Sequence, residues 1–128
     1  MDQLFELDHW RVISFDKGTK EAGCEAVVKI YVKGDKVHVA DTGNGPVDAL
    51  YNTLCKALKG FYPAINELVL VDYIVHAENS NKGTAANVKV IVEMRRKRKS
   101  YIAKSISTNI LVASWNALVE AVTALLSE

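Results

Sequence analysis

One segment of this sequence has residue types and spacing suited to binding chemistry: Gly43-Asn44-Gly45-Pro46-Val47-Asp48. Proline suits the first position of a helix, where its missing N–H costs nothing, and the glycines before it allow a sharp backbone turn. The free N–H groups of a helix's first turn favour a carboxylate or a phosphate. Asp48 lies in the same turn and could accept hydrogen bonds from an ammonium group. An amino acid carries both charges and would match the segment.

A purely structural interpretation competes with this one. Taken alone, the segment is better explained as a tight strand-to-helix turn in which Asp48 complements the helix dipole. The second half of the chain has Ser107-Thr108-Asn109-Ile110 at the equivalent place, without glycines and without an acid. A turn of this kind therefore does not require the glycines, and the comparison favours an additional role for the first copy.

Other reactive residues form no recognisable catalytic or metal-binding pattern. His9, His38 and His76 have no common spacing, and no ligand-type residues accompany them as a metal site would require. Cys24 and Cys55 are better explained as reduced, buried thiols than as a disulfide or a nucleophile. The sequence contains no nucleophile elbow, phosphate-binding loop or dinucleotide fingerprint. We expect no catalysis and no cofactor in this chain.

The elements around the segment are duplicated. A shift of 64 residues superimposes nine identical residues, and each half has the order of three alternating segments followed by a helical stripe. The matched pairs are Leu4/Leu68, Asp8/Asp72, Ala22/Ala86, Val28/Val92, Lys33/Lys97, Ala49/Ala113, Asn52/Asn116, Leu54/Leu118 and Ala57/Ala121. We expect one domain over residues 1–128 with internal repeats at about 1–64 and 65–128.

Hydrophobic periodicity gives the expected elements. In the first half, strands are predicted at 9–15, at 24–32 with the even-numbered residues buried, and from Val37, after a hairpin turn at 33–36. A helix follows from Pro46 until Gly60. Its buried face is predicted to contain Val47, Leu50, Tyr51, Leu54, Cys55 and Leu58. The second half predicts strands at 68–77, 86–94 and 101–106, and a helix from Ile110 capped by Asn109. The fold class is α+β, with two pseudo-twofold-related βββα units of antiparallel sheet packed with helices.

Composition excludes several classes of protein. With 49% hydrophobic residues and a formal charge of +1, the chain is neither disordered nor a dedicated nucleic-acid binder. The basic run 95–99 falls at a strand end and hairpin, where a solvated turn is favoured over a nucleic-acid surface. No secretory signal or membrane span is evident. We expect a cytoplasmic protein without membrane or nucleic-acid partners.

Four segments together resemble a known family. They are 43–49, Leu70-Val71-Asp72-Tyr73, Gly83-Thr84-Ala85-Ala86, and the stretch from Ser107 to Trp115. The chain is similar, from about His9 onward, to the C-terminal regulatory domain of the α-isopropylmalate synthase and citramalate synthase family. Phe61-Tyr62-Pro63 and 113–118 look closer to the citramalate branch. The basic run 95–99 is not a feature associated with this family.

The resemblance implies a regulatory function. In such enzymes an N-terminal catalytic barrel is an acetyl-CoA-dependent acyltransferase, condensing acetyl-CoA with pyruvate or 2-oxoisovalerate by means of a divalent metal. The regulatory domain forms a homodimer and binds a branched-chain amino acid as feedback inhibitor. Isoleucine is the expected effector, and leucine sensing for 2-isopropylmalate synthase is the alternative. The chain would be an excised domain or a free-standing relative.

The resemblance also implies which residues bind the effector. The polar floor would consist of Asn44, Gly45 and Asp48, although the family varies at the position of Asp48. The closing loop would be formed by Gly83, Thr84 and Ala85. The apolar walls would come from Val47, Leu70, Tyr73, Ala77 and Ile110.

Overall fold

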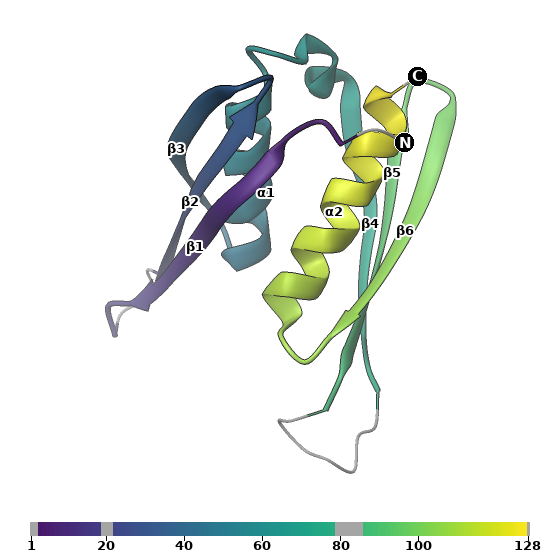
Figure 1. Cartoon of the computed structure of the whole chain (residues 1–128). Coiled ribbons are helices and arrows are strands. Elements are labelled where there is room, and N and C mark those ends of the chain that lie inside the picture. Colours follow the sequence, from purple (N-terminus) through teal and green to yellow (C-terminus); the bar gives the residue numbers. More distant parts are fainter. Residues whose placement is uncertain (1–2, 19–21, 79–85, 128) are drawn as a thin grey trace. The chain divides into compact units, whose positions relative to one another are not determined.

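The computed structural model describes residues 3–18, 22–78 and 86–127. Internal contacts divide the chain into two compact units, Asp2–Asn66 and Glu67–Glu128, which we call the N-terminal unit and the C-terminal unit. Each unit is a three-stranded antiparallel sheet with one α-helix on one face (Figure 1). The predicted α+β class with two βββα units is therefore confirmed.

The N-terminal unit contains β1 (Glu6–Asp16), β2 (Ala22–Val32), β3 (Asp35–Gly43) and α1 (Pro46–Leu58). A short 3-10 helix, η1 (Pro63–Glu67), leads to the C-terminal unit. The strand order is β1-β2-β3, and α1 contacts β2 and β3 most. The third strand begins at Asp35, two residues before the predicted start at Val37, and runs to Gly43.

The C-terminal unit contains β4 (Leu68–Ala77), β5 (Val88–Arg96), β6 (Lys99–Ser107) and α2 (Ile110–Leu126). The strand order is β4-β5-β6, and α2 packs against β5 and β6. The bounds of β4 agree with the sequence prediction, whereas β5 begins and ends two residues later than predicted. Asn109 caps α2 as expected.

The core of the N-terminal unit follows the alternation of β2. Its even-numbered residues Cys24 to Val32 are all buried, as predicted, and they pack under Leu50, Leu54 and Leu58 of α1. The buried face of α1 also includes Ala49, Thr53 and Ala57, whereas Val47, Tyr51 and Cys55 are only half-buried. The reason is steric: three small residues at four-residue spacing let the helix approach the sheet closely, so the predicted face is rotated.

The C-terminal end of α1 also differs from the prediction. The helix ends at Leu58, and the cap is Lys59, whose backbone N–H donates to Cys55 O at 3.0 Å. Gly60, the predicted terminator, lies beyond the cap and does not have a positive φ.

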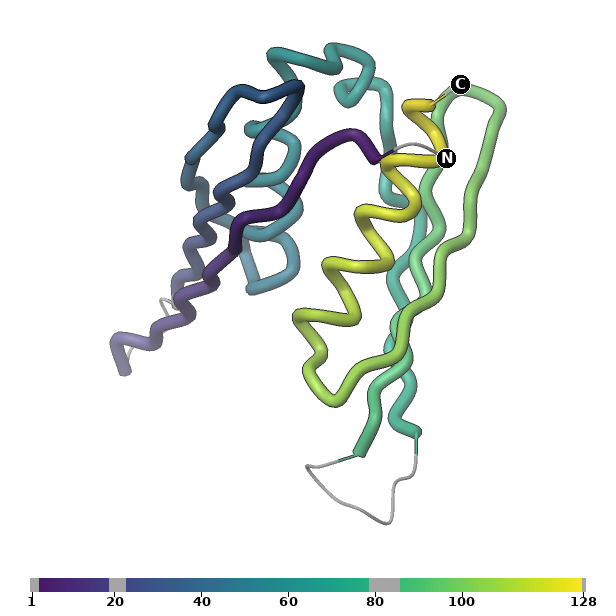
Figure 2. The backbone as a smooth tube through the Cα atoms, in the orientation of Figure 1, coloured from purple at the N-terminus to yellow at the C-terminus, as the bar shows by residue number. Residues whose placement is uncertain are grey.

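The duplication extends to backbone detail. Both second hairpins, β2–β3 and β5–β6, turn at a lysine with positive φ, 51° at Lys33 and 55° at Lys97. Each turn has two residues, Lys33–Gly34 or Lys97–Arg98, instead of the four predicted at 33–36. Figure 2 follows the backbone through both hairpins. Both first strands also carry an irregularity near their start, between Leu7 and His9 and between Leu70 and Asp72.

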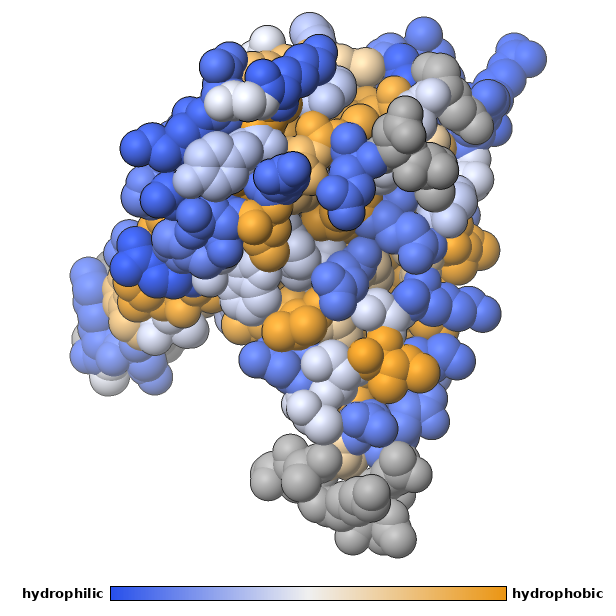
Figure 3. Space-filling view, in the orientation of Figure 1, coloured by the Kyte–Doolittle hydropathy of each residue, from blue (hydrophilic) through white to orange (hydrophobic). Residues whose placement is uncertain are grey.

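The sheet faces opposite the helices carry exposed apolar side chains. In β6, Ile102 and Ile106 are 56% and 58% exposed, while Ala103 on the helix side is fully buried. In Figure 3, hydrophobic groups lie among hydrophilic side chains over the strands. Among the described residues, no helix has the length and apolar character needed to cross a membrane.

Candidate functional site

The junction of β3 with α1 brings Asn44, Gly45, Val47 and Asp48 together, as the sequence predicted for a local segment. Gly43 ends the strand, Gly45 is the N-cap and Pro46 occupies the first helical position. The Asn52 side chain donates to Thr42 O at 3.1 Å and ties the helix to the end of the strand. The backbone amides of the first turn are thereby held in a fixed place.

The two positions of the junction, 43 and 45, differ in whether the fold requires glycine there. A β-carbon on Gly43 would lie 2.6 Å from the Ala49 Cα, so the close approach of β3 to α1 requires glycine there. A β-carbon on Gly45 would meet no atom within 4 Å, and its backbone is extended with φ −152°. Neither packing nor backbone conformation of the described chain requires glycine at position 45.

The start of α1 has no side-chain cap. Gly45 has no side chain that could accept from the first-turn amides, and Pro46 has no N–H. At the start of α2, by contrast, Asn109 Oδ1 accepts from the N–H groups of Leu111 at 2.9 Å and Val112 at 3.4 Å. The equivalent N–H groups of α1, on Val47 and Asp48, are left for an acceptor from outside the cap.

Asp48 is partly engaged within the turn itself. Its Oδ2 accepts from the backbone N–H of Asn44 at 2.8 Å. A carboxylate here also complements the positive end of the helix dipole. One carboxylate oxygen thus stabilises the turn, and Oδ1 has no hydrogen-bond partner among the residues described.

In the C-terminal unit, three predicted wall residues share one strand face. Leu70, Tyr73 and Ala77 pair with Met94, Val92 and Val88, on the side of the sheet that carries α2. Leu70 and Tyr73 are half-buried, and Ala77 is exposed. Ile110, the first residue of α2, is 42% exposed. Gly83, Thr84 and Ala85, the predicted closing loop, lie outside the described residues.

Tyr73 has a polar contact that the sequence did not predict. Its hydroxyl oxygen lies 2.7 Å from Ser114 Oγ, and the Ser114 side chain is fully buried. The sequence did contain a sign that Ser114 needs a hydrogen-bond partner, because it is a polar residue within the apolar stripe of α2. The hydrogen bond fixes the Tyr73 ring against the helix.

The cysteines have no catalytic environment. Cys24 is buried and its thiol donates to Ser14 Oγ at 3.3 Å. Desolvation raises the pKa of Cys55, and the hydrogen bond with Tyr51 only partly opposes this. A raised pKa disfavours the reactive thiolate.

Of the histidines, His9 makes a close pair with a carboxylate. Its Nδ1 lies 2.6 Å from Asp8 Oδ1, and this hydrogen bond is the main reason why the pKa of Asp8 is lowered. The His38 ring meets the His9 ring edge-on at 6.1 Å. Across residues 3–18, 22–78 and 86–127, no three His, Cys, Asp or Glu side chains gather as a metal site would need.

Comparison with known proteins identifies the family. The model of the LeuA allosteric (dimerisation) domain matches residues 1–126. The chain belongs to this family. The resemblance seen in the sequence is thus confirmed over almost the whole chain.

Similar full-length proteins are citramalate synthases. This LeuA-family domain is 39% identical over 115 residues to the (R)-citramalate synthase of Aquifex aeolicus, covering 89% of this chain and 22% of the relative. It is 34% identical over 121 residues to that of Streptomyces coelicolor, covering 94% and 23%. With the Geobacter sulfurreducens protein the identity is 41% over 98 residues, covering 77% and 19%. The chain therefore spans about a fifth of the length of these relatives, and the likeness to the citramalate branch is confirmed.

Proposed function

We propose that this allosteric domain binds a branched-chain amino acid, with isoleucine favoured, and regulates a citramalate synthase-like acyltransferase in isoleucine biosynthesis. The observation that carries the proposal is Gly45, a glycine at an uncapped helix start that the chain's own packing does not require. A ligand carboxylate that approaches the backbone closely would explain it. Leucine, as effector of a 2-isopropylmalate synthase, is the alternative.

The polar end of the ligand has complementary partners in the N-terminal unit. The N–H groups of Val47 and Asp48 would donate to its carboxylate, and Asp48 Oδ1 would accept from its ammonium group. Hydrogen bonds to charged groups contribute about 1.5 to 3 kcal/mol each. A four-carbon side chain adds about 1.5 to 3 kcal/mol when buried. Once the cost of association is subtracted, these contributions are consistent with a binding free energy of about 8 kcal/mol, which corresponds to a micromolar dissociation constant.

For the apolar end, the family resemblance implies wall residues at Val47, Leu70, Tyr73, Ala77 and Ile110 and a closing loop of Gly83, Thr84 and Ala85. Shape alone would separate isoleucine from leucine, because one displaced methyl group changes affinity by about 1 to 3 kcal/mol. Titration calorimetry with isoleucine, leucine, valine and methionine measures this preference. Absence of binding by all four would refute the proposal.

A substitution at Gly45 tests the site more sharply. In Gly45→Ser the new hydroxyl would cap the first-turn N–H groups and compete with the ligand carboxylate, so we expect unchanged or higher stability with at least tenfold weaker effector binding, about 1.4 kcal/mol. Gly60→Ser is the matched control, because Gly60 is also surrounded by open space. Equal affinity in both variants would show that the carboxylate binds elsewhere.

The domain would act as a homodimer. Ile102 and Ile106 on the outer face of β6 are both more than half exposed, and clustered exposed apolar residues are typical of an interface with a second copy. Effector binding would favour one dimer arrangement and so change the population of active states in the attached catalytic region. Analytical ultracentrifugation of Ile102→Glu/Ile106→Glu should show monomers. A variant that remains dimeric would place the interface elsewhere.

A further inference from the structure

The two units differ in what covers the open edge of their last strand. β3 and β6 are both edge strands, because each lies at the end of its three-stranded sheet. An exposed edge presents unpaired N–H and C=O groups with which another strand can pair, so proteins usually cover it. Because the chain is duplicated, β3 shows how this fold covers such an edge. β6 can be compared with β3 residue by residue, at the shift of 64.

The two-residue turns decide which backbone groups of these strands point outward. In β6 the turn is closed by the pair Arg96↔Lys99, and pairs that exchange hydrogen bonds then alternate with pairs that do not. Residues in the second kind of pair direct their N–H and C=O groups away from the neighbouring strand. These residues are Ser100, Ile102, Lys104 and Ile106 in β6, and Lys36, His38, Ala40 and Thr42 in β3.

In β3, side chains occupy the outward groups nearest the end of the strand. The Lys56 Nζ donates to Ala40 O at 3.0 Å, and the Asn52 Nδ2 donates to Thr42 O at 3.1 Å. The Thr42 N–H donates to Asp41 Oδ1 at 2.8 Å. An added strand would have to displace all three interactions, so this edge is closed.

In β6 the equivalent groups do not cover the edge. Ser105 stands at the position of the acid, and Glu120, an acceptor, stands at the position of the lysine. The Glu120 carboxylate accepts instead from the Tyr101 hydroxyl at 3.1 Å. Asn116 is retained, but it is exposed and makes no hydrogen bond with the residues described. Within the described chain, the outward groups from Ile102 to Ile106 therefore have no hydrogen-bond partner.

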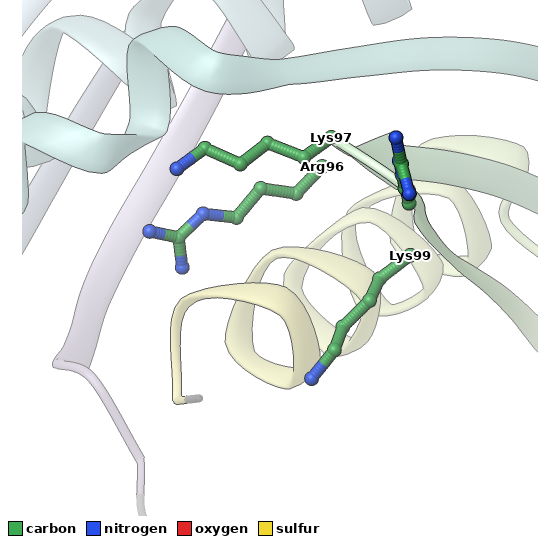
Figure 4. Close-up of a pocket in the computed structure, with 4 residues that line it drawn as sticks. Arg96, Lys97 and Lys99 are labelled. Atoms are coloured by element: carbon green, nitrogen blue, oxygen red, sulfur yellow. The ribbon is translucent and has the colours of Figure 1, made fainter.

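Two long cations next to this edge are engaged elsewhere in the C-terminal unit. Arg96 and Lys97 run nearly side by side at the hairpin (Figure 4). The Arg96 Nε lies 3.3 Å from Glu67 Oε2, and the Lys97 Nζ lies 3.4 Å from Glu67 Oε1. The Arg96 guanidinium also donates to Leu125 O at 2.9 Å. Neither side chain covers a carbonyl group of β6.

The side chains of the open edge favour a partner over solvent. Ile102 and Ile106 are 56% and 58% exposed, on the sheet face opposite α2. Edge strands that stay free usually carry several charges or a bulge. β6 pairs with β5 without a register shift, and Lys104 is the one charged residue between the two isoleucines. This edge is therefore straight, largely apolar and unprotected.

We propose that the open edge of β6 pairs with the same edge of a second copy, so that two three-stranded sheets join into one. The inference rests on the homodimer of the proposed function and assigns its surface. The matching family model describes a dimerisation domain, and antiparallel pairing of one edge with itself across a twofold axis gives a closed dimer. A dimer of this kind satisfies the outward backbone groups of both copies at once.

The length of the strand indicates the register of this pairing. β6 spans Lys99–Ser107, so its longest self-pairing is centred on Ala103. Lys104 then lies opposite Ile102 of the partner subunit instead of opposite another lysine, which avoids repulsion between like charges. Ala103 is small and fully buried on the helix side, so it fits at the axis, where the two strands approach closely.

Transfer of the covering groups of β3 to β6 tests the proposal. Ser105→Asp/Glu120→Lys supplies the acid and the lysine, and Asn116 is already in place. Analytical ultracentrifugation of the full chain should show a dimer dissociation constant about tenfold or more above that of the wild type, because pairing must now displace these groups. Circular dichroism checks the fold. An unchanged dissociation constant in the folded variant would overturn the proposal.

Proline provides a second test with a matched control. At an outward position it removes no hydrogen bond from inside the sheet. Lys104→Pro should therefore leave the unit folded but weaken the dimer about tenfold or more. Ala40→Pro makes the same change at the equivalent position of the closed edge and should leave the dissociation constant unchanged. Equal weakening by both prolines would contradict a specific role of the β6 edge.

Hydrogen exchange measured by NMR separates edge pairing from packing of the outer sheet faces. The amides of Ile102, Lys104 and Ile106 should be protected in the dimer and should lose this protection on dilution. The outward amide of Ala40 should exchange rapidly at every concentration. A folded dimer in which the three β6 amides exchange as fast as that of Ala40 would refute the edge pairing but not the homodimer.

The remaining outcomes are also decisive. A wild-type chain that stays monomeric would refute both the homodimer and the edge pairing. Protection of the β6 amides in a sample that sediments as a monomer would mean that something other than a second copy occupies the edge, and would equally refute the proposal. None of these measurements requires isoleucine, so the amino-acid site is tested separately.

Discussion

The backbone N–H of Asn44 donates a hydrogen bond of 2.8 Å to the carboxylate of Asp48, so the acid that faces the proposed effector also holds the turn before α1. This arrangement gives Asp48 two separable roles. One is structural and needs only an acceptor oxygen. The other is recognition of an ammonium group and needs the negative charge.

Substitution of Asp48 separates these roles. Asp48→Asn retains an oxygen for the Asn44 N–H and should lower stability by less than about 1 kcal/mol, mainly through the helix dipole. The same variant should bind isoleucine about tenfold or more weakly, because a charged hydrogen bond is lost. Asp48→Ala should add a further loss of stability of about 1 kcal/mol. Thermal denaturation and calorimetry on the same samples measure both effects, and full affinity in Asp48→Asn would remove the ammonium role.

Replacement by alanine should have different effects on stability at the two glycines before α1. Gly43→Ala forces a β-carbon against the backbone of Ala49 and should destabilise the domain by about 1 to 3 kcal/mol. Gly45→Ala has open space and an extended backbone, so it should cost no more than the roughly 0.5 to 1 kcal/mol that separates alanine from glycine at an N-cap. Urea denaturation of both variants tests this difference. Similar losses in both would mean that Gly45 is needed for folding, and would weaken its assignment to a ligand.

Sequence patterns predicted the parts of the fold that depend on local periodicity. The burial of Cys24 to Val32 followed from strict alternation, and the cap at Asn109 followed from its side-chain chemistry. The rotated face of α1 was missed because Ala49, Thr53 and Ala57 are small, and hydrophobicity alone gives little weight to close approach. Thr53 can be buried because its hydroxyl donates to Ala49 O at 2.7 Å, and a pattern of apolar residues does not reveal such a hydrogen bond.

The candidate site was predictable only in its local part. Positions 43–48 are adjacent in sequence, so their chemistry could be assessed without a structure. The different reasons for Gly43 and Gly45 depend on how near α1 comes to β3, which is a tertiary property. The partners Tyr73 and Ser114 are separated by 41 residues, and Glu67 and Arg96 by 29, so neither contact has a local signal.

The hydrogen bond between Tyr73 and Ser114 should couple the strand to α2. Tyr73→Phe leaves the buried Ser114 hydroxyl without its partner and should cost about 1 to 3 kcal/mol of unfolding free energy. Ser114→Ala should cost less, because the half-exposed Tyr73 hydroxyl can bind water. A double-mutant cycle should give a coupling of about 1 kcal/mol. A coupling near zero would mean that the 2.7 Å contact does not hold the ring in place.

The ion pairs of Glu67 predict how stability changes in acid. Partial desolvation raises the pKa of Glu67, but its hydrogen bond and charge interaction with Lys97, and then those with Arg96, outweigh this and hold it below its ordinary value of 4.5. The folded chain therefore binds fewer protons than the unfolded chain at this group. Its contribution is fully present above pH 4.5 and is lost as the pH falls through the lowered value.

The measurement is the unfolding free energy from denaturant titrations at several pH values, for the wild type and for Glu67→Gln. The difference between the two should be constant above pH 4.5 and should shrink at lower pH, since protonated glutamate resembles glutamine. Asp8 also has a lowered pKa, chiefly through its hydrogen bond with His9, but it contributes to both proteins and cancels. Glu25→Gln, at an exposed position of β2, controls for removal of a negative charge. A difference that grows as the pH falls would mean that Glu67 is destabilised by its surroundings, contrary to the ion pairs with Arg96 and Lys97.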